Sequence, residues 1–292
     1  MKAEQKQTAS EFFLPATDYD LAATLNSGQV FRWRQHGEFW MGVVGDKYVR
    51  LRQERDGIFA EMDAETHDRD LLREFLQTDI DLENILQTFP DDEPMNRAVT
   101  ACRGLRILRQ DPWECLASFI LSATKQIVQI RQIVAMLCSN FGEEISECSE
   151  TKPGDLSRAF PSAERIAGLT EKDLRDCRMG FRAPNLLAAS RHIAEGKLEL
   201  ETLRHRSCQE ARMELMKLRG VGEKIADCVL LFAYGFDSAF PVDVWVERAL
   251  RTLYFPRRRV NEKTLLKFAA THFGPHAGYA QQYLFHYMRT CQ

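Results

Sequence analysis

The fold of this chain is constrained most by one run of residues, 218–228, which reads Leu-Arg-Gly-Val-Gly-Glu-Lys-Ile-Ala-Asp-Cys. Gly220 and Gly222 set a tight turn, and the apolar residues after them have helical spacing. A glycine turn that leads into a helix exposes backbone N–H groups, and the helix dipole there favours a negative charge. The run therefore predicts two helices joined by a turn that binds a phosphate group.

Two ionisable residues flank this turn. Lys224 lies near the start of the second helix, and Asp243 lies in Pro-Val-Asp-Val at 241–244, where a further helix is expected to begin. Taken alone, the lysine is most simply a solvated residue on a helix face and the aspartate a helix N-cap. Together with a phosphate-binding turn, an amine and a carboxylate indicate an enzyme that acts on nucleic acid.

The run at 218–228 resembles the helix-hairpin-helix DNA glycosylases, and among them the bifunctional 8-oxoguanine DNA glycosylase/AP lyases of the HhH-GPD superfamily. A second match reads Ser-Gly-Gln-Val-Phe-Arg-Trp at 27–33, and a third reads Gly-Tyr-Ala-Gln at 278–281 and continues through Leu284 and Phe285. The three matches span nearly the whole chain in the family's order. The resemblance implies a DNA repair enzyme whose partner is double-stranded DNA that contains oxidised guanine.

The resemblance also implies the catalytic pair. The damaged nucleotide must leave the duplex before its sugar can be attacked. Lys224 would attack C1′ and form a Schiff base with the opened sugar, and β-elimination would then cleave the strand. Asp243 would stabilise the positive charge on the sugar and help to position or deprotonate the amine. An amine attacks only when it is unprotonated, so we expect Lys224 to be surrounded by apolar groups.

The implied base pocket distinguishes oxidised guanine by its N7 hydrogen, which one backbone acceptor at Gly28 would meet. Cys228 and Phe285 would sandwich the purine, and Gln281 would bond its Watson–Crick edge. The alternatives are a plain turn at Gly28 and ordinary helix packing at Gln281 and Phe285. The full set expected to bind the base is Gly28, Cys228, Phe232, Gln281, Phe285 and Trp245.

Trp245 and the loop after Phe119 depart from the family. Many relatives have histidine beside the catalytic acid, so Trp245 either stacks near the sugar or packs. The family's loop is rich in asparagine and is followed by an arginine, whereas this chain has Ser-Ala-Thr-Lys-Gln at 122–126 and glutamine at 129. Because these residues would read the base opposite the lesion, we expect a relaxed preference there. The expected DNA contacts are Gly220, Val221, Gly222, Thr124, Lys125, Gln126, Gln129, the wedge Phe181 and Arg182.

The family's hairpin also holds a monovalent cation, either potassium or sodium. Its ligands here would be the backbone carbonyls of Met216, Leu218 and Val221. Some relatives carry a four-cysteine iron–sulfur cluster after the catalytic region, but only Cys291 follows Cys228 in this chain. We therefore expect no iron–sulfur cluster, no zinc and no required cofactor.

The hydrophobic pattern predicts an α+β fold. An antiparallel (TBP-like) sheet domain with flanking helices is expected at 1–105, and an all-α region at 106–292 that contains the hairpin at about 208–235. The first ten residues are expected to be frayed, and Pro90 to Pro94 should interrupt the helices. Strands are predicted at 31–34, 39–44, 48–51 and a further one from 58. Helices are predicted after a cap at Thr66, from Asp111-Pro112 to a break at 122–124, from 127 to 142, and at 163–167, 171–177, 183–195, 208–218, 223–234, 244–253, 262–272 and 276–289.

Charge and composition limit the remaining classes. The net charge is −3, so any affinity for DNA must come from local patches such as 204–224. The triplet Arg257-Arg258-Arg259 is either a solvated loop or a phosphate contact. With eight scattered cysteines and no apolar run of membrane-spanning length, we expect a soluble, intracellular monomer with reduced thiols. A cytoplasmic or nucleoid location is expected in a bacterium, and a nuclear one stays open.

Two other functions remain open from the sequence. A glycosylase for alkylated bases would use the same hairpin and acid with water as the nucleophile, and would not need Lys224. A non-catalytic hairpin module would explain Gly220 and Gly222 but not the pairing of Lys224 with Asp243. The segment Ser27-Gly28-Gln29 favours the oxoguanine branch.

Overall fold

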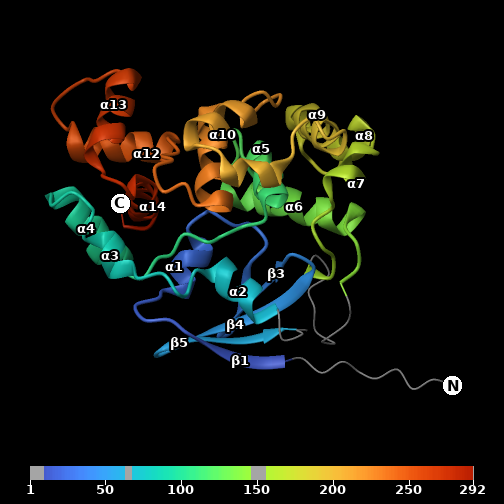
Figure 1. Ribbon diagram of the computed structural model, residues 1–292, viewed down its shortest axis with the longest axis horizontal. Helices are drawn as coiled ribbons and strands as arrows, with labels where there is room; N and C mark the ends of the chain where they lie inside the picture. The colour runs from blue at the N-terminus through green and yellow to red at the C-terminus, as the bar shows by residue number, and fades with distance from the viewer. Residues whose placement is uncertain (1–9, 63–67, 146–155, 292) are drawn as a thin grey trace.

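The computed structural model describes residues 10–62, 68–145 and 156–291. A five-stranded antiparallel sheet is followed along the chain by a body of helices that lies above it in the view of Figure 1. The predicted fold class is therefore confirmed. Thr66 and residues 1–9 lie outside the described residues, so the helix cap and most of the expected frayed end are not tested.

The sheet has the strand order β1-β5-β4-β3-β2. Its members are β1 (Ser10–Pro15), β2 (Arg34–His36), β3 (Phe39–Val44), β4 (Lys47–Glu54) and β5 (Gly57–Met62). Strand β1 was not predicted, and Ser10, which was expected to be frayed, pairs with Met62. Phe12 and Leu14 alternate with exposed neighbours along β1, which is the burial pattern of an edge strand with one covered face.

The prediction of a strand at 31–34 is wrong except at its last residue. Phe31 packs edge to face on Phe119 in the helical body, with ring centroids 5.7 Å apart, whereas Trp33 stacks on Phe75 of the helix Asp68–Leu76 in the core of the sheet domain. The segment thus bridges two hydrophobic cores. Aromatic and β-branched residues are typical of strands, but here they anchor an irregular crossing, because long-range packing overrides local preference.

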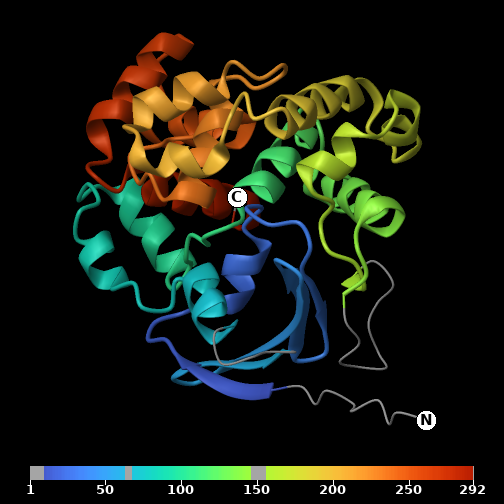
Figure 2. The ribbon, with the colours of Figure 1, turned by 45° about the vertical axis from the view of Figure 1, so that its right-hand side comes forward.

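One face of the sheet is covered by α1 (Leu21–Asn26) and α2 (Asp68–Leu76), which lie between the strands and the helical body (Figures 1 and 2). Leu21, Leu25, Leu72 and Leu76 are buried against the strands in one core. The last residues of α1 lead directly into Ser27 and Gly28, so this packing fixes where that segment meets the helices.

The helices of the body fold around a second, larger core. They are α3 (Leu82–Leu86), α4 (Glu93–Cys102), α5 (Pro112–Leu121), α6 (Ile127–Phe141), α7 (Ala163–Ala167), α8 (Glu171–Asp176), η2 (Gly180–Arg182), α9 (Ala183–Ala194), η3 (Leu200–His205), α10 (Cys208–Leu215), α11 (Glu223–Val229), η4 (Leu230–Tyr234), α12 (Val244–Ala249), η5 (Leu250–Tyr254), α13 (Glu262–His272) and α14 (Ala277–Thr290). Here η2 and η3 are 3₁₀ turns, and η4 and η5 are π-helical turns that continue α11 and α12.

Most predicted helix boundaries are confirmed because they rest on local caps. Asp111 caps α5 with Pro112 at its first position, and Gly142 ends α6. The expected interruption at 90–94 is wrong at its end, because Pro94 lies in the first turn of α4, where a missing N–H costs nothing. Helix α4 packs on α14 and shares the core of the helical body. Among the described residues, no helix is long and apolar enough to cross a bilayer.

Candidate active site

The glycine turn joins α10 to α11 as predicted. Gly220 has φ +82°, and a Cβ built there would lie 2.3 Å from the side-chain nitrogen of Asn185, so both the conformation and the close approach require glycine. Gly222 is the N-cap of α11, and a Cβ there would meet nothing within 4 Å. The N-terminus of α11 therefore opens to the outside, and a phosphate has room to approach its N–H groups.

A buried ion pair fastens the two helices of this hairpin. Arg212 on α10 donates from Nε to Oδ1 of Asp227 on α11 at 2.6 Å. Asp227 is only 9% exposed. Burial raises the pKa of Asp227, and the hydrogen bond and charge of Arg212 lower it. This contact, which depends on two helices and was not predicted, ties the second turn of α11 to α10.

Lys224 lies in the first turn of α11 and is half-buried. Its Nζ donates to Oγ of Ser122 at 3.2 Å and lies 5.3 Å from the centroid of the Phe119 ring. Ser122 follows α5, and its hydroxyl donates in turn to the carbonyl of Phe119. The amine therefore points across the body to the end of α5 and is held over an aromatic face.

Asp243 caps α12, as the simplest interpretation of the sequence predicted. Its Oδ1 accepts from the backbone N–H of Trp245 at 3.0 Å and of Val246 at 2.9 Å. Within the described residues, no hydrogen bond reaches its second oxygen, Oδ2. Capping thus orients the carboxylate and leaves one oxygen for a ligand.

Lys224 and Asp243 are close enough to act on each other. Burial, the largest effect, raises the pKa of Asp243, while the bond from Val246 and the charge of Lys224 lower it. Cys228 lies one turn after Lys224 and experiences both charges; burial raises the pKa of its thiol to about 12. The thiol is therefore neutral at physiological pH, and it offers a soft, uncharged surface near both the amine and the carboxylate.

Gly28 and Phe285 meet near this centre, because Arg289 lies close to both and its charge acts on Asp243. Gly28 has φ +81°, and a Cβ built there would lie 3.3 Å from Cε1 of Phe285 and 2.7 Å from Cδ1 of Ile127. The residues on either side of Gly28 are fixed. The Gln29 amide bonds the carbonyl of Arg106 and the N–H of Leu108, and Gln282 donates to the carbonyl of Ser27 at 3.0 Å. The backbone at Gly28 is thus held rigidly against an aromatic ring.

Gln281 is 4% exposed, and its Oε1 is buried without a hydrogen-bond partner in the part of the chain that the structure describes. It lies one turn before Phe285 on α14 and so shares a helix face with that ring. A buried acceptor without a partner is costly, and a ligand that donates hydrogen bonds would meet it. Helix packing alone therefore leaves the Gln281 oxygen unmet in the described part of the chain, whereas for Phe285 the alternative of ordinary packing stays open.

Phe232 and Trp245 lie at different depths. Phe232 is buried and stacks on Phe119, with centroids 5.5 Å apart, so it supports the ring under Lys224 from within the core. Trp245 is 37% exposed at the start of α12, and the guanidinium of Arg248 lies 5.9 Å from its ring. Of these two aromatic residues, only Trp245 is placed to meet a ligand from outside.

The loop between α5 and α6 is strained and tied down. Thr124 has φ +56°, which is unfavourable for a β-branched residue. Arg182 is 3% exposed, and it donates to the carbonyl of Ala123 and from Nη2 to Oγ1 of Thr124 at 2.6 Å. Without a ligand, the guanidinium of Arg182 therefore holds this loop. The neighbouring Phe181 is 59% exposed, as a wedge between bases would need to be.

The rest of this loop presents polar side chains. Thr124, Gln126 and Gln129 are exposed, and Lys125 is half-buried. Gln129 accepts from the backbone N–H of Gln126 at 3.2 Å, which caps α6. The loop and Lys224 meet at Ser122, so the expected opposite-base residues border the catalytic pair.

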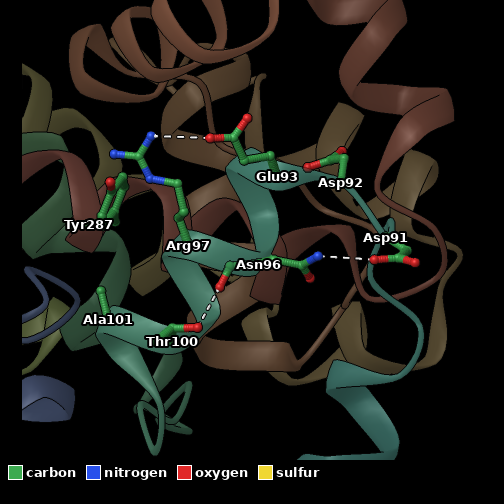
Figure 3. A pocket seen from close by; sticks show the side chains of 8 residues that line it. All are labelled: Asp91, Asp92, Glu93, Asn96, Arg97, Thr100, Ala101 and Tyr287. Carbon is green, nitrogen blue, oxygen red and sulfur yellow. Dashed lines mark hydrogen bonds and ion pairs between the residues drawn. The ribbon is translucent and has the colours of Figure 1, made fainter.

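A hollow of about 650 Å³ lies elsewhere, beside α4 and the other face of α14 (Figure 3). It is lined by Asp91, Asp92, Glu93, Asn96, Arg97, Thr100, Ala101 and Tyr287. Asp92 is fully engaged, because it accepts from Met95 N at 2.8 Å and Tyr254 Oη at 3.2 Å and contacts His272 Nε2 at 2.7 Å. A hollow rich in carboxylates repels DNA, so its size does not make it the active site.

Two family models together match residues 11–272 of this chain. Residues 11–116 match the family model described as the N-terminal domain of 8-oxoguanine DNA glycosylase, and residues 117–272 match that of the HhH-GPD superfamily base excision DNA repair proteins. A probable N-glycosylase/DNA lyase of Methanothermobacter thermautotrophicus is 30% identical over 94% of this chain and 95% of its own. An N-glycosylase/DNA lyase of Saccharomyces cerevisiae is 32% identical over 80% of this chain and 68% of its own.

Two solved structures are similar over nearly the whole chain. MBOgg1 in complex with a low-affinity DNA ligand has a TM-score of 0.89 and 33% identity, covering 99% of this chain and 98% of that one. The 8-oxoguanine glycosylase/lyase of Clostridium acetobutylicum, bound to double-stranded DNA containing cytosine opposite to 8-oxoG, has a TM-score of 0.87 and 31% identity. That match covers 95% of this chain and 97% of the other.

Proposed function

The chain belongs to the HhH-GPD superfamily of base excision DNA repair proteins, and from this premise we propose that it excises 8-oxoguanine from duplex DNA and cleaves the strand at the resulting abasic site. The relatives named N-glycosylase/DNA lyase and the similar 8-oxoguanine glycosylase structures support both activities. Double-stranded DNA is accordingly its macromolecular partner.

One observation carries the proposal. An amine held over an aromatic ring by Ser122 and a capped, half-buried carboxylate interact with each other and with the Cys228 thiol, while Gly28 and Phe285 meet nearby. An alkylation glycosylase that uses water needs no such lysine. A binding module needs neither the lysine nor an acid whose pKa is raised by burial.

The residues suggest the following reaction. Nζ of Lys224 attacks C1′ of the everted nucleotide, the bond from C1′ to N9 breaks, and the base leaves with a proton. Asp243 stabilises the positive charge that develops on the sugar and takes a proton from the amine. The C1′–O4′ bond then breaks, O4′ takes a proton, and the opened sugar is left as a Schiff base on Lys224. The Schiff base acidifies the C2′ hydrogen, and loss of that proton expels the 3′ phosphate by β-elimination.

The pocket fits a guanine that carries an N7 hydrogen. The buried Oε1 of Gln281 lacks a donor, and the Watson–Crick edge of guanine presents the N1 and N2 hydrogens. The carbonyl of Gly28 would accept from N7–H, which unmodified guanine lacks, because its N7 carries a lone pair. The neutral thiol of Cys228 and the ring of Phe285 would hold the two faces of the purine.

We further propose a relaxed preference for the base opposite the lesion. Thr124 and Gln129 are short or uncharged, and Arg182 is occupied by the carbonyl of Ala123 and by Thr124. Excision rates on 8-oxoguanine paired with each of the four bases test this statement. Rates within about tenfold of one another are expected, and a steep preference for cytosine would contradict it.

A potassium or sodium ion at the hairpin fits the backbone. Within the described chain, no backbone N–H outside the helices donates to the carbonyls of Met216 or Val221, and Leu218 O accepts only from Val221 N, at 3.1 Å. These oxygens, with a helix C-terminus among them, suit a hard cation, which would rigidify the turn that binds phosphate. We propose that the enzyme requires no zinc, iron–sulfur cluster or other cofactor. We also propose that it is a monomer and acts inside the cell, where its DNA substrate is found.

The test is covalent trapping with borohydride on a duplex that contains 8-oxoguanine, with strand cleavage scored beside it. Wild-type protein should be trapped and Lys224→Gln should not. Lys217→Gln is the matched control, because Lys217 is an exposed lysine near the other side of the turn that pairs with Glu214. Excision without trapping by the wild type would favour a water-dependent glycosylase, and binding without excision would favour a non-catalytic module.

A further inference from the structure

Two arginines from distant parts of the chain meet at the end of α1. Arg131 on α6 donates from Nη2 to Oδ1 of Asn26 at 3.3 Å, and Arg289 on α14 donates from Nη1 to the carbonyl of Asn26 at 3.4 Å. Both bonds are long, and both acceptors are uncharged groups of one residue. We call Asn26, Arg131 and Arg289 the arginine cluster.

The charge of the arginine cluster is not balanced by ion pairs. Among the described residues, no carboxylate lies within ion-pair distance of Arg131 or Arg289. Burial lowers the pKa of Arg131, and the charges of Arg289 and Arg34 lower it further. Like charges held together in a partly desolvated place are costly unless an anion joins them.

Hydrogen-bonding capacity is also left over. A guanidinium carries five N–H donors, and among the described residues the buried Nε of Arg131 has no hydrogen-bond partner. The donors form a fork that suits two oxygens of a phosphate group. The cluster therefore offers both charge and directed donors that the folded chain does not use.

The position of the cluster shows which anion it would meet. Arg289 lies 5.2 Å from the centroid of Phe285, and its Nη1 lies 3.4 Å from the place of a Cβ on Gly28. Burial lowers the pKa of Arg289, whereas the charge of Asp243 raises it, so this side chain experiences the catalytic acid. The cluster thus borders the proposed base pocket, on the side of Gly28 rather than of the hairpin turn.

We propose that the arginine cluster binds a backbone phosphate of the DNA strand that carries the everted nucleotide, on the opposite side of that nucleotide from the hairpin. The inference rests on the proposed function only in requiring that a nucleotide leaves the duplex. A phosphate held on each side would fix the everted sugar between Lys224 and Asp243. The negative charge of the phosphate would also offset the repulsion between the two arginines, which already lie close together at Asn26.

The test is the salt dependence of binding to a duplex that contains a tetrahydrofuran abasic analogue, which has no base and cannot form a Schiff base. Neutralising one phosphate contributes a slope of about −0.9 to the plot of log K against log salt concentration. The double variant Arg131→Gln/Arg289→Gln should bind about tenfold more weakly and lose about one unit of slope. Arg131→Lys/Arg289→Lys, which keeps the charge, should keep most of the slope.

Arg97→Gln is the matched control, because Arg97 lies on the other side of α14, pairs with Glu93 and should leave the slope unchanged. Melting temperature checks that each variant is folded. An unchanged slope in a folded Gln double variant overturns the proposal. So does unchanged affinity for the tetrahydrofuran duplex with slower excision of 8-oxoguanine, because the arginines would then contact the base.

Failure of the proposed function is recognised separately in the same titration. Wild-type protein should bind the tetrahydrofuran duplex more tightly than an undamaged one if it everts nucleotides. If it shows no such preference and no excision, the proposed function fails, whatever the arginines do. If the wild-type protein still prefers the tetrahydrofuran duplex but the salt slope is the same in the variants, only the proposal for the arginine cluster fails.

Discussion

The two faces of α14 differ in how completely their polar groups are satisfied. Within the part of the chain that the structure describes, the face with Gln281, Phe285 and Arg289 has a buried oxygen without a donor and a guanidinium without a carboxylate. On the side of α4, Tyr283 donates to the carbonyl of Leu105 at 3.2 Å, and Tyr287 lines the large acidic hollow of Figure 3. The proposed functional face is therefore distinguished by unmet hydrogen bonds and charges, whereas the acidic hollow lies beside satisfied groups.

The largest loss of activity on the proposed functional face is expected when Asp243 is replaced. Asp243→Asn should keep the N-cap of α12, because asparagine caps well, but should slow excision by about 10³-fold because the charge is lost. Burial raises the pKa of Asp243 above its unfolded value, so its contribution to stability is present at low pH and is lost as pH rises through the folded pKa. The variant should thus be at least as stable as the wild type at neutral pH, by chemical denaturation. A destabilised variant with normal excision would make Asp243 a cap alone.

Replacing Gly28 is expected to cause a smaller loss of activity that affects base excision more than cleavage of abasic sites. A Cβ would meet Ile127 and Phe285 at a backbone φ of +81°, so Gly28→Ala should displace the carbonyl and the ring together. Excision of 8-oxoguanine should fall by about 10²-fold, while cleavage of preformed abasic sites changes by less than about threefold. Gly45→Ala, also at positive φ but with nothing within 4 Å, is the control for backbone strain. An equal fall of both activities would remove the Gly28 carbonyl as the discriminator.

Substitutions on the two sides of α14 are expected to change the free energy of unfolding in opposite directions. Gln281→Leu removes a buried acceptor that has no donor, so it should slow excision by about tenfold and raise the free energy of unfolding by up to about 1 kcal/mol. Asp92→Ala removes a cap with three partners, so it should lower that free energy by about 2–3 kcal/mol and leave excision unchanged. Denaturant melts beside single-turnover rates test both, and a loss of stability in Gln281→Leu would break the comparison.

The smallest effect is a shift of the pH profile. The carboxylate form of Asp243 is the active one, and burial raises its pKa, so excision should fall on the acid side at a higher pH than for an ordinary aspartate. The charge of Arg289 lowers that pKa, so Arg289→Gln should move the acid limb to still higher pH. Single-turnover excision rates at saturating protein, measured across the acid range, give the position of this acid limb. A shift of the limb to lower pH in Arg289→Gln would contradict this account.

Local signals predicted most of the helices and the hairpin. Asp111, Gly142 and Asp243 set helix ends by capping within a few residues, and Gly220 needs a positive φ that its own turn imposes. These features depend on neighbours in sequence, so they can be recognised there. Both ends of the long helix α6 followed from such local signals, and the fold class followed from the hydrophobic pattern along the chain.

Features that depend on distant partners could not be predicted. Ser122 meets Lys224 across 102 residues, and Arg131 and Arg289 meet only because both reach Asn26. Phe31 looks like a strand residue but packs on α5. The alternation of Phe12 and Leu14 was a signal for β1, and it was missed because the polar residues before it suggested a frayed end.

The central claim is that the amine of Lys224 reaches the sugar of an everted nucleotide. The most direct measurement is to trap the wild-type protein on 8-oxoguanine DNA with borohydride, digest the complex and locate the reduced sugar by peptide mass spectrometry. We predict a single adduct on Lys224. An adduct on Lys125, which lies beside Ser122, or on any other lysine would contradict the account.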